Sequence, residues 1–447
     1  MFNRLAAFPE SRRILILHLL STPFSAVYFG VIEIMPVMLL KDFNAASWHI
    51  PIATSALSAM FLLSICWNEI YLRSNVRIYL LLVYLLAYLP VAGIALCHRP
   101  EWVLAIVLLS SMGLAGFNSL NGDMLRHCYA EPIRSEVWGL LNAVWQGAIM
   151  VLAYAVGKWL DADGQAFRIY MPVSAVLLAI GVWLLARITY EPLFAERARA
   201  RPTQPVGEAL RSAYANMTKT LREDPVFRRY ETAFGIYGMG WMTCAALLPF
   251  LAVDILNMSY TGFARSTQVA FKLTFILMII PAGSLIHRFG PIRVAGRCFA
   301  LMSLWPVGMT LVSLLPAGLL QSRVELGLGR PLVSELSLAV VMVASAVATS
   351  GIHLAWTLGP VALARDPAHA ASYLAIHATL VGVRSVVAQF PAVLLYRLTG
   401  QIWLPLSLAI VLFLTGAWLM RRLERAPQAP TEPAVPEVMP PDPAEVA

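Results

Sequence analysis

Two basic side chains interrupt a long apolar stretch near the C-terminal end of the chain. His377 and Arg384 lie in LAIHATLVGVRSVVAQFPAVLL, seven residues apart. Seven residues are close to two helical turns, so both side chains project from one face of a helix. A guanidinium binds carboxylates or phosphates in a planar fork, and an imidazole titrates near neutral pH. The spacing predicts a site for an anionic solute whose binding depends on pH. The alternative is that Arg384 clamps helices together through carbonyl groups or a buried acid.

Two further ionisable residues fall inside apolar segments. Glu33 precedes Pro36 in VYFGVIEIMPVMLL, and Lys272 lies in a later apolar segment. A carboxyl group in apolar surroundings is suited to picking up and releasing protons, so Glu33 is a candidate for proton coupling. The alternative for Glu33 is a hydrogen bond between packed helices. Lys272 either pairs with an acid or contributes positive charge to a pocket.

Uncharged polar and aromatic residues complete the set of predicted solute-binding groups. His353 and Trp356 face similar directions in GIHLAWTLGP. The full predicted binding set is Arg384, His377, His353, Trp356, Asn118, Asn142, Gln146 and Lys272. Its cationic members all belong to the second half of the chain, whereas the first half contributes amides and Glu33. This asymmetry favours an anionic or zwitterionic organic solute.

The motifs of enzymes, metal sites and cofactor sites are missing from the sequence. Its five cysteines are scattered, with no CxxC pair and no Cys/His spacing typical of zinc. There is no HExxH, no nucleophile elbow and no phosphate-binding loop. We therefore expect no metal, no cofactor and no enzymatic activity.

Composition indicates the elements that must position these residues. The chain has 447 residues, of which 59% are hydrophobic and 13% charged, and its mean hydropathy is +0.70. A soluble domain cannot bury so much apolar surface, and lipid leaves helices as the spanning structure for windows of this length. We predict twelve transmembrane helices. They lie at about 14–40, 50–72, 77–97, 102–124, 137–158, 167–188, 230–256, 264–286, 294–316, 333–360, 371–396 and 401–420.

The distribution of positive charge sets the predicted orientation. Most of the 33 Lys and Arg residues lie in the segments that share a side with the N-terminus. The positive-inside rule then places both termini in the cytoplasm, in a bacterial-type inner membrane. The net charge of +8 is thus explained by topology, and nucleic acid is not an expected partner. The expected partners are the lipid bilayer, a small-molecule solute and protons, and the chain is expected to be a monomer.

The chain divides into two similar halves. We predict six-helix bundles at 1–188 and 230–425, a linker at 189–229 containing an amphipathic helix on the membrane surface, and a disordered Pro-rich tail at 426–447. A shift of 235 residues, without gaps, aligns the fourth and fifth windows with the tenth and eleventh. The matched positions are Gly116 with Gly351, Glu131 with Asp366, Pro132 with Pro367, Trp138 with Tyr373, Gly147 with Gly382, Asn118 with His353, and Asn142 with His377.

One loop carries a recognisable signature. GSLIHRFGPIR follows the eighth window and contains Gly283, His287, Arg288, Gly290 and Arg293. It resembles the G-x-L-x-D-R-x-G-x-x-x-R loop of the major facilitator superfamily, with histidine where that family usually has aspartate. The equivalent first loop, NEIYLRSNVR, keeps the cations and lacks the glycines. The resemblance implies two pseudo-symmetric bundles around a central cavity, alternating access, and a gating role for this loop.

The leading hypothesis is therefore secondary active transport of a small organic solute, coupled to protons. One alternative is a non-transporting assembly or scaffold protein on the same fold, whose centre would be packed with side chains. Another alternative is a lipid exporter. The identity of the solute and the direction of transport do not follow from the sequence.

Overall fold

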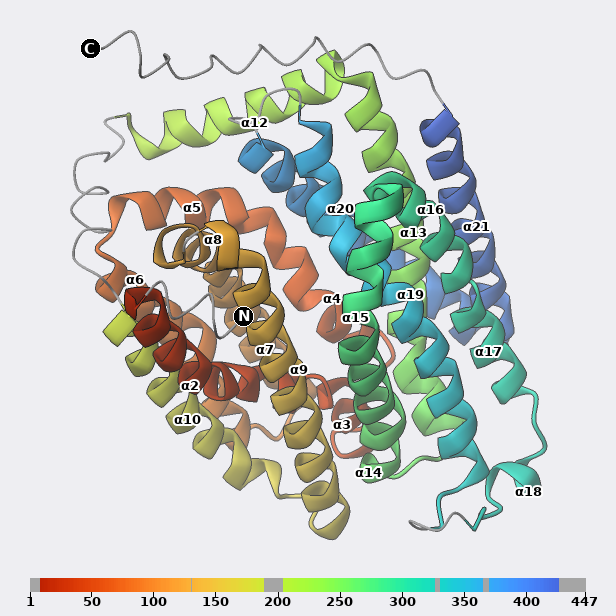
Figure 1. Ribbon diagram of the computed structural model, residues 1–447. Coiled ribbons are helices and arrows are strands. Elements are labelled where there is room, and N and C mark those ends of the chain that lie inside the picture. Colours follow the sequence, from red (N-terminus) through yellow and green to blue (C-terminus); the bar gives the residue numbers. More distant parts are fainter. Residues whose placement is uncertain (1–8, 130, 189–203, 326–329, 365–369, 426–447) are drawn as a thin grey trace, which may run out of the picture.

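The chain forms helices almost throughout. The computed structural model describes residues 9–129, 131–188, 204–325, 330–364 and 370–425, and in these segments there is no strand (Figure 1). A single antiparallel bridge joins Arg323 to Leu332 in the described part of one loop. The all-α fold class is confirmed. The predicted tail at 426–447 and residues 189–203 of the linker lie outside the described residues.

The first half of the chain forms one group of helices, coloured red to yellow in Figure 1. Its helices and helical turns are α2 (Pro9–Ile32), α3 (Met35–Lys41), α4 (His49–Met60), η1 (Phe61–Leu63), α5 (Ser64–Arg73), α6 (Val76–Val83), η2 (Tyr84–Tyr88), η3 (Leu89–Leu96), α7 (Pro100–Ala115), α8 (Phe117–Cys128), α9 (Glu131–Ala162) and α10 (Phe167–Ile188).

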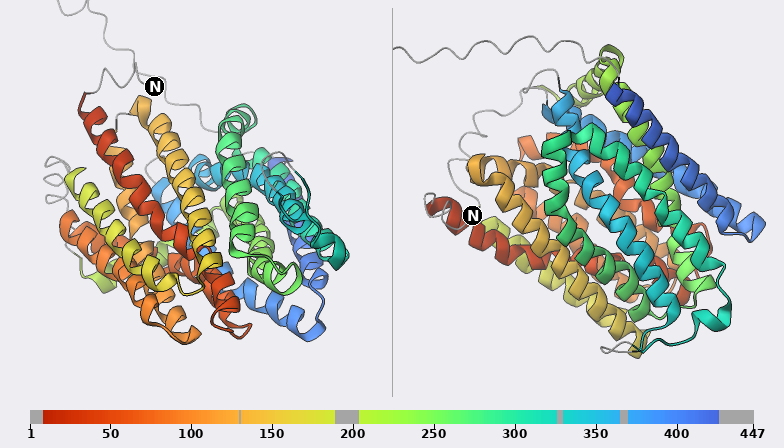
Figure 2. Two further views of the ribbon diagram at one scale, coloured as in Figure 1. Left: turned by 90° about the horizontal axis from the view of Figure 1, so that it is seen from below. Right: turned by 45° about the vertical axis from the view of Figure 1, so that its right-hand side comes forward.

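The second half forms a second group, coloured green to blue, which lies beside the first in Figure 1 and in the left view of Figure 2. Before it, α12 (Val206–Glu223) runs across one end of the molecule. The elements of the second group are α13 (Pro225–Phe250), η4 (Leu251–Ile255), α14 (Tyr260–Phe263), η5 (Ala264–Val269), α15 (Ala270–Phe289), α16 (Pro291–Met302), α17 (Leu304–Ser313), α18 (Ala317–Leu320), α19 (Val333–Leu363), α20 (Ala370–Thr399) and α21 (Trp403–Arg425).

The helices fall on the predicted apolar windows. Ten described helices are long and apolar enough to cross a membrane, and the pair His49–Leu63 and Cys66–Arg73 forms a bent eleventh candidate. The fourth window holds the shorter apolar helix α7, which ends at Gly116 and continues as α8. The expected layout of twelve spans is consistent with this pattern.

The first span is broken at Glu33. The α2 helix ends at Ile32 and α3 begins at Met35, so Glu33 lies in the break. Pro36 is near the start of α3, where its missing N–H removes no helical hydrogen bond but stops α2 from continuing. The proline thus explains the break, and the break exposes the neighbourhood of Glu33 to partners from other helices.

The two helix groups converge at the end that carries α14 and lie further apart at the end that carries α12 (Figure 1). We call these the α14 end and the α12 end. The α12 helix has the expected amphipathic pattern, with Met217 and Leu221 packed against the core and its other face exposed. The hydroxyl of Tyr214 donates to the carbonyl of Leu62, 3.4 Å away, which fastens α12 to the first group.

Glycine allows one very close approach inside the first group. A Cβ added to Gly113 on α7 would lie 2.5 Å from the backbone nitrogen of Ala87. Because the obstacle is backbone, no rotamer change can relieve the contact. By contrast, a Cβ at Gly147 on α9 would meet nothing within 4 Å.

These two glycines give a matched test of the packing. Gly113→Ala is expected to lower the free energy of unfolding by about 1–3 kcal/mol, because the added methyl must push α7 away from its neighbour. Gly147→Ala is expected to be neutral or stabilising by up to about 1 kcal/mol, because alanine favours helices more than glycine does. Thermal unfolding in detergent measures both. Equal stability of the two variants would contradict the close approach.

Candidate functional site

A cavity of about 370 Å³ lies between the two helix groups. Most of its wall comes from α2, α4, α7, α8, α9 and α10 of the first group, and α19 of the second group supplies the rest. This volume is in the range of pockets that hold small organic ligands. A cavity at the junction of the two halves is where relative motion of those halves alters access.

The polar part of the wall consists of neutral groups and two histidines. His18 on α2 and His353 on α19 come from opposite halves of the chain. His18 Nδ1 is 3.0 Å from the hydroxyl of Tyr129. The other polar lining residues are Ser21, Thr22, Ser25, Asn121, Asn142 and Thr357. Among the described lining residues there is no Asp, Glu, Lys or Arg.

Aromatic rings make up much of the remaining wall. The aromatic lining residues are Phe29, Phe61, Tyr88, Phe117, Trp138, Trp145 and Trp356. Trp145 and Phe29 meet edge to face with ring centroids 4.8 Å apart, so their orientation is fixed by mutual packing. Flat apolar faces combined with hydroxyls, amides and imidazoles suit a solute that has a ring and several hydrogen-bonding groups.

The structure brings only part of the predicted binding set to this cavity. Asn142, His353 and Trp356 line it. Asn142 donates from its amide to the carbonyl of Trp138 at 3.0 Å. Gln146, one turn further along α9, is buried but is not a lining residue. The side chain of Asn118 lies outside the described part of the structure.

Arg384 is not a lining residue of this cavity. Its Nη1 donates to the carbonyl of Phe234 on α13, at 2.5 Å. The guanidinium occupies space that exists because residue 238 is glycine, since a Cβ there would lie 2.1 Å from Cζ of Arg384. Arg384 therefore joins α20 to α13, which is the clamp that the sequence analysis left open as an alternative.

His377 also has a protein partner. Its Nδ1 is 2.9 Å from each carboxylate oxygen of Glu231 on α13, and both side chains are buried. Trp356 packs edge to face on the imidazole at a centroid distance of 5.2 Å. His377 thus lies close to the cavity wall without reaching the cavity.

Glu33 and Lys272 form an ion pair across the two halves of the chain. Lys272 Nζ on α15 is 3.1 Å from Oε1 of Glu33 in the break of the first span. The side chain of Lys272 is 10% exposed and that of Glu33 is 27% exposed, so the pair is largely shielded from solvent. Of the two roles considered for Lys272, pairing with an acid is the one that the structure supports.

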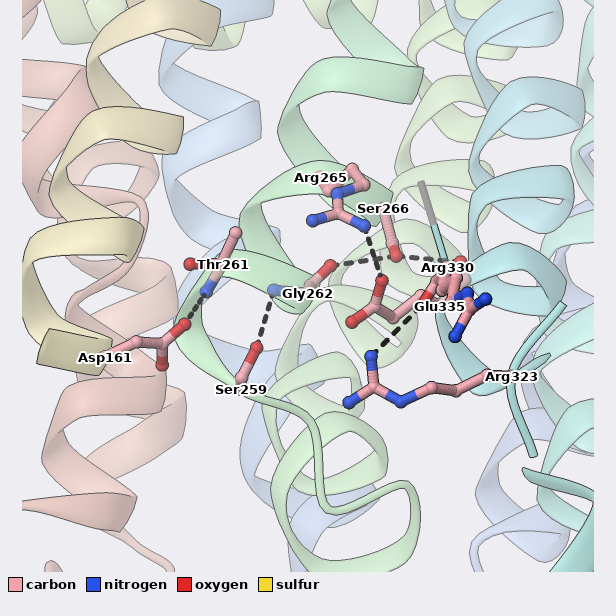
Figure 3. Close-up of polar contacts among 9 residues, drawn as sticks. All are labelled: Asp161, Ser259, Thr261, Gly262, Arg265, Ser266, Arg323, Arg330 and Glu335. Carbon is pink, nitrogen blue, oxygen red and sulfur yellow. Dashed lines mark hydrogen bonds and ion pairs between the residues drawn. The ribbon is translucent and has the colours of Figure 1, made fainter. Parts of the chain in front are cut away.

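Further polar contacts join the two halves at the α14 end. The carboxylate of Asp161, at the end of α9, accepts from the backbone N–H groups of Tyr260 and Thr261 at 2.7 and 2.8 Å. Figure 3 shows the contact to Thr261. Lys41 donates to the carbonyl of Met258 at 2.7 Å. These bonds close the molecule at the α14 end.

The same cluster extends into the second half (Figure 3). Arg265 and Glu335 form an ion pair at 3.0 Å, and the hydroxyl of Ser266 donates to the carbonyl of Glu335 at 2.8 Å. The hydroxyl of Tyr260, at the start of α14, donates to Asp42 of the first half at 2.7 Å. Burial raises the pKa of Asp42, while the Tyr260 hydroxyl and Lys41 act in the opposite direction. The start of α14 is therefore held from both sides.

Comparison with known proteins identifies the family. The model of the Major Facilitator Superfamily matches residues 17–383, which is most of the chain. The chain belongs to the major facilitator superfamily. No curated protein sequence matches it. The resemblance based on the loop after the eighth window is confirmed.

Solved structures of transporters share the fold. A mutant of the nucleoside transporter NupG superposes with a TM-score of 0.67 at 11% identity, over 92% of this chain and 99% of that one. A POT family transporter in complex with a thioalcohol-conjugated peptide gives 0.65 at 13% identity, over 92% and 96%. The xylose transporter XylE from E. coli gives 0.59 at 13% identity, over 92% and 98%. At these identities the likeness concerns the fold alone.

The superfamily loop lies between α15 and α16, toward the α12 end. Gly290 ends α15 with φ of +78°, a conformation that L side chains rarely adopt. His287 and Arg288 are exposed, and Arg293 pairs with Glu424 of α21. The gating role of Gly283, His287, Arg288, Gly290 and Arg293 stays a prediction.

Two ionisable residues at or near the cavity, His18 and Glu231, were not predicted from the sequence. His18 interrupts an apolar run in the first span, as His377 does in the eleventh, so the same argument was available for it. Glu231 was harder to find because the predicted seventh window began at residue 230, whereas α13 begins at Pro225 behind the cap of Asp224. The earlier start moves Glu231 from the margin into the helix.

The clamp at Arg384 yields a test. Arg384→Ala is expected to lower the free energy of unfolding by about 1.5–3 kcal/mol, the range of a charged hydrogen bond. Solute affinity of the folded fraction is expected to stay unchanged, because the guanidinium does not line the cavity. Thermal unfolding and ligand titration of the purified protein measure the two effects, with Arg222→Ala on the exposed face of α12 as the control. Normal stability with selective loss of affinity for anions would restore the anion-site hypothesis.

Proposed function

We propose that this protein is a secondary active transporter of a small organic solute, which works by alternating access and is coupled to protons. The observation that carries the proposal is the cavity between the two halves, combined with the polar contacts that tie those halves together at the α14 end. A site at the junction, with one end of the molecule closed, is the arrangement that alternating access requires.

The proposed moving units are the bundles at 1–188 and 230–425, joined by the linker at 189–229. The proposed orientation places the α12 end and both termini in the cytoplasm of a bacterial-type inner membrane. In this orientation the described conformation is closed toward the outside. The basic residues of α12 and its neighbouring segments then face the anionic surface of the inner leaflet.

The lining of the cavity supports a solute that is uncharged and carries a ring. The anionic preference rested on Lys272, His353, His377 and Arg384 acting together, and only His353 lines the cavity. Seven aromatic side chains and several neutral polar groups favour stacking and hydrogen bonding. Among the described lining residues there is no Lys or Arg to bind an anionic group.

Proton coupling is proposed to act through Glu33 and Lys272. The ion pair links the break in the first span to α15, so it holds the two halves together. Protonation of Glu33 removes one charge of the pair and weakens this link. A proton that enters at Glu33 thereby favours separation of the halves near this point, which is how proton binding is converted into movement.

A scaffold protein on this fold is the competing class. It was expected to have a centre packed with side chains, whereas a cavity of about 370 Å³ is present between the halves. The cavity favours a transporter over a scaffold. A lipid exporter stays an alternative, distinguished by the chemistry of the solute that binds.

The solute class is tested by a stabilisation screen on the purified protein. Neutral heteroaromatic compounds are expected to raise the unfolding temperature at neutral pH, because ligand binding stabilises the folded state. Carboxylate-bearing analogues are expected to leave it unchanged, because no Lys or Arg lies among the described lining residues to balance their charge. Stabilisation by carboxylates alone at neutral pH would contradict this solute class, and stabilisation by lipids alone would favour the exporter.

Trp145→Ala supplies the site-specific control for that screen. Loss of one aromatic contact is expected to weaken binding of the best neutral compound by about 0.5–1.5 kcal/mol beyond the loss of buried area. Trp102→Ala is the matched variant, because Trp102 is 65% exposed and lies away from the cavity. Equal affinities in the two variants would show that the compound binds elsewhere.

The coupling proposal predicts the behaviour of Glu33→Gln. The amide cannot lose a proton, so proton-driven accumulation of the solute in vesicles is expected to stop while exchange of solute across the membrane continues. Glu208→Gln, on the exposed surface of α12, is expected to behave as wild type. Unchanged accumulation by Glu33→Gln would remove Glu33 from the mechanism.

A further inference from the structure

A buried cluster of ionisable groups lies just behind the cavity wall and takes no part in the proposed coupling pair. It consists of Glu231 on α13 with His377 and Arg384 on α20. His377 is fully buried and Glu231 is 6% exposed. A carboxylate, a guanidinium and an imidazole in one apolar region are costly to assemble, and such groups in spanning helices commonly serve proton or ion movement.

An ionised Glu231 determines which nitrogen of His377 carries the hydrogen. Nδ1 is 2.9 Å from both oxygens of Glu231. An ionised carboxylate only accepts hydrogen bonds, so Nδ1 must carry the hydrogen and donate it. In a neutral imidazole the other nitrogen, Nε2, then holds a lone pair. Nε2 is buried and has no hydrogen-bond partner among the described residues.

Charge balance allows this lone pair to take a proton. Glu231 carries a negative charge and Arg384 a positive one, and the two interact electrostatically. With a neutral imidazole the cluster has no net charge, and a proton at Nε2 makes it positive by one. Glu231, which already accepts from Nδ1, stabilises that imidazolium. The acid thus both orients the imidazole and compensates the added charge.

The surroundings of His377 contain few other titratable groups. From α13 the ring of Tyr230 lies 6.1 Å away, and its hydroxyl donates to the carbonyl of Ala355. On α20 itself, Tyr373 donates to Asp224 at the start of α13. From α19, Trp356 packs on the imidazole, and His353 faces the cavity.

The remaining elements packed against α20 are α4, η1, α5 and α21. Arg421, Arg422 and Arg425 of α21 are exposed. The other charged groups of these elements have partners of their own. Glu69 pairs with Arg73 on α5, Arg293 pairs with Glu424 of α21, and His49 of α4 lies 3.5 Å from Glu101. Glu231 is therefore the acid that acts directly on His377.

Trp356 connects the cluster to the cavity. Its indole lines the cavity and also packs on the imidazole of His377, with centroids 5.2 Å apart. A charge at Nε2 attracts the face of a neighbouring indole and repels its edge. The two rings meet edge to face, so a proton at His377 changes the electrostatic energy of its contact with Trp356. We infer that the Glu231–His377 pair is a proton-binding site whose occupancy is sensed at the cavity wall through Trp356.

Proton binding at this site is independent of any transported solute. Only the consequence for solute binding rests on the proposed function. The pair differs from Glu33–Lys272 because both of its members belong to the second half, so a proton here changes the cavity wall without breaking a link between the halves. Failure of Glu33→Gln to alter transport therefore leaves this inference standing.

Tryptophan fluorescence of the purified protein, followed between about pH 5 and pH 8, tests the inference. A protonated imidazole quenches an adjacent indole, so acidification is expected to quench Trp356. The quench is obtained by subtracting the Trp356→Phe signal from that of wild type. When the signal of the His377→Gln, Trp356→Phe double variant is subtracted from that of His377→Gln, the remaining fluorescence is expected not to change with pH. His98→Gln, at an exposed position, is the matched control and should retain the component.

A third variant separates a proton site from a merely structural pair. In Glu231→Gln the quench is expected to need more acid, by about 1–3 pH units, because the amide does not stabilise the imidazolium charge. A component that persists without His377, or that is absent from folded wild type, would overturn the inference. If His377→Gln does not fold, the wild-type and Glu231→Gln titrations decide alone, and identical midpoints would also overturn it.

Discussion

Charge inside a membrane-spanning fold must be balanced nearby, and this constraint organises the second half of the protein. Lys272, Arg384 and His377 each lie in a helix that crosses the apolar region, and each has a protein partner: Glu33, the carbonyl of Phe234, and Glu231. An unbalanced charge in such a helix costs about 2.5–3.5 kcal/mol on insertion scales. The partners decide which helices stand side by side, since α20 is held to α13 and α15 to the break in the first span.

Because the fixed charges bond to protein groups outside the cavity, the cavity is left to neutral chemistry. Its wall is aromatic and hydroxylic, with two histidines as its titratable groups among the described lining residues. A wall of this kind selects a solute by shape and hydrogen bonding. The charged groups lie behind the wall or at the junction of the halves.

The two ends of the molecule differ in the kind of contact that joins the halves. At the α14 end the halves are joined by hydrogen bonds to backbone groups, as in the contacts of Asp161 and Lys41. Backbone donors cannot move independently of their helix, so movement of α14 as a whole away from α9 breaks both bonds to Asp161. At the α12 end a surface helix crosses the molecule and is fastened to the first group by Tyr214. Closure at one end and a movable connection at the other suit a molecule whose halves rock about the cavity.

Sequence reasoning located most spans correctly because apolar length is a local property that lipid imposes on each helix separately. The superfamily loop followed from its glycines and cations. The break near Glu33 was not predicted, although Pro36 explains it. The apolar pattern did not identify Glu231 as a residue inside a helix. The helix α13 begins earlier than its apolar window, because the N-cap Asp224, and not hydropathy, sets that boundary.

The sequence by itself determined the class of protein, the order of its apolar segments, the family and the buried charges other than Glu231. Only the tertiary structure decided which of these charges meet. His377 and Arg384 do share a helix, yet which way that helix turns depends on α13 and α19, and it turns both side chains toward protein partners. Helical periodicity specifies which residues share a face, whereas the neighbour of that face is chosen by the packing of all helices together.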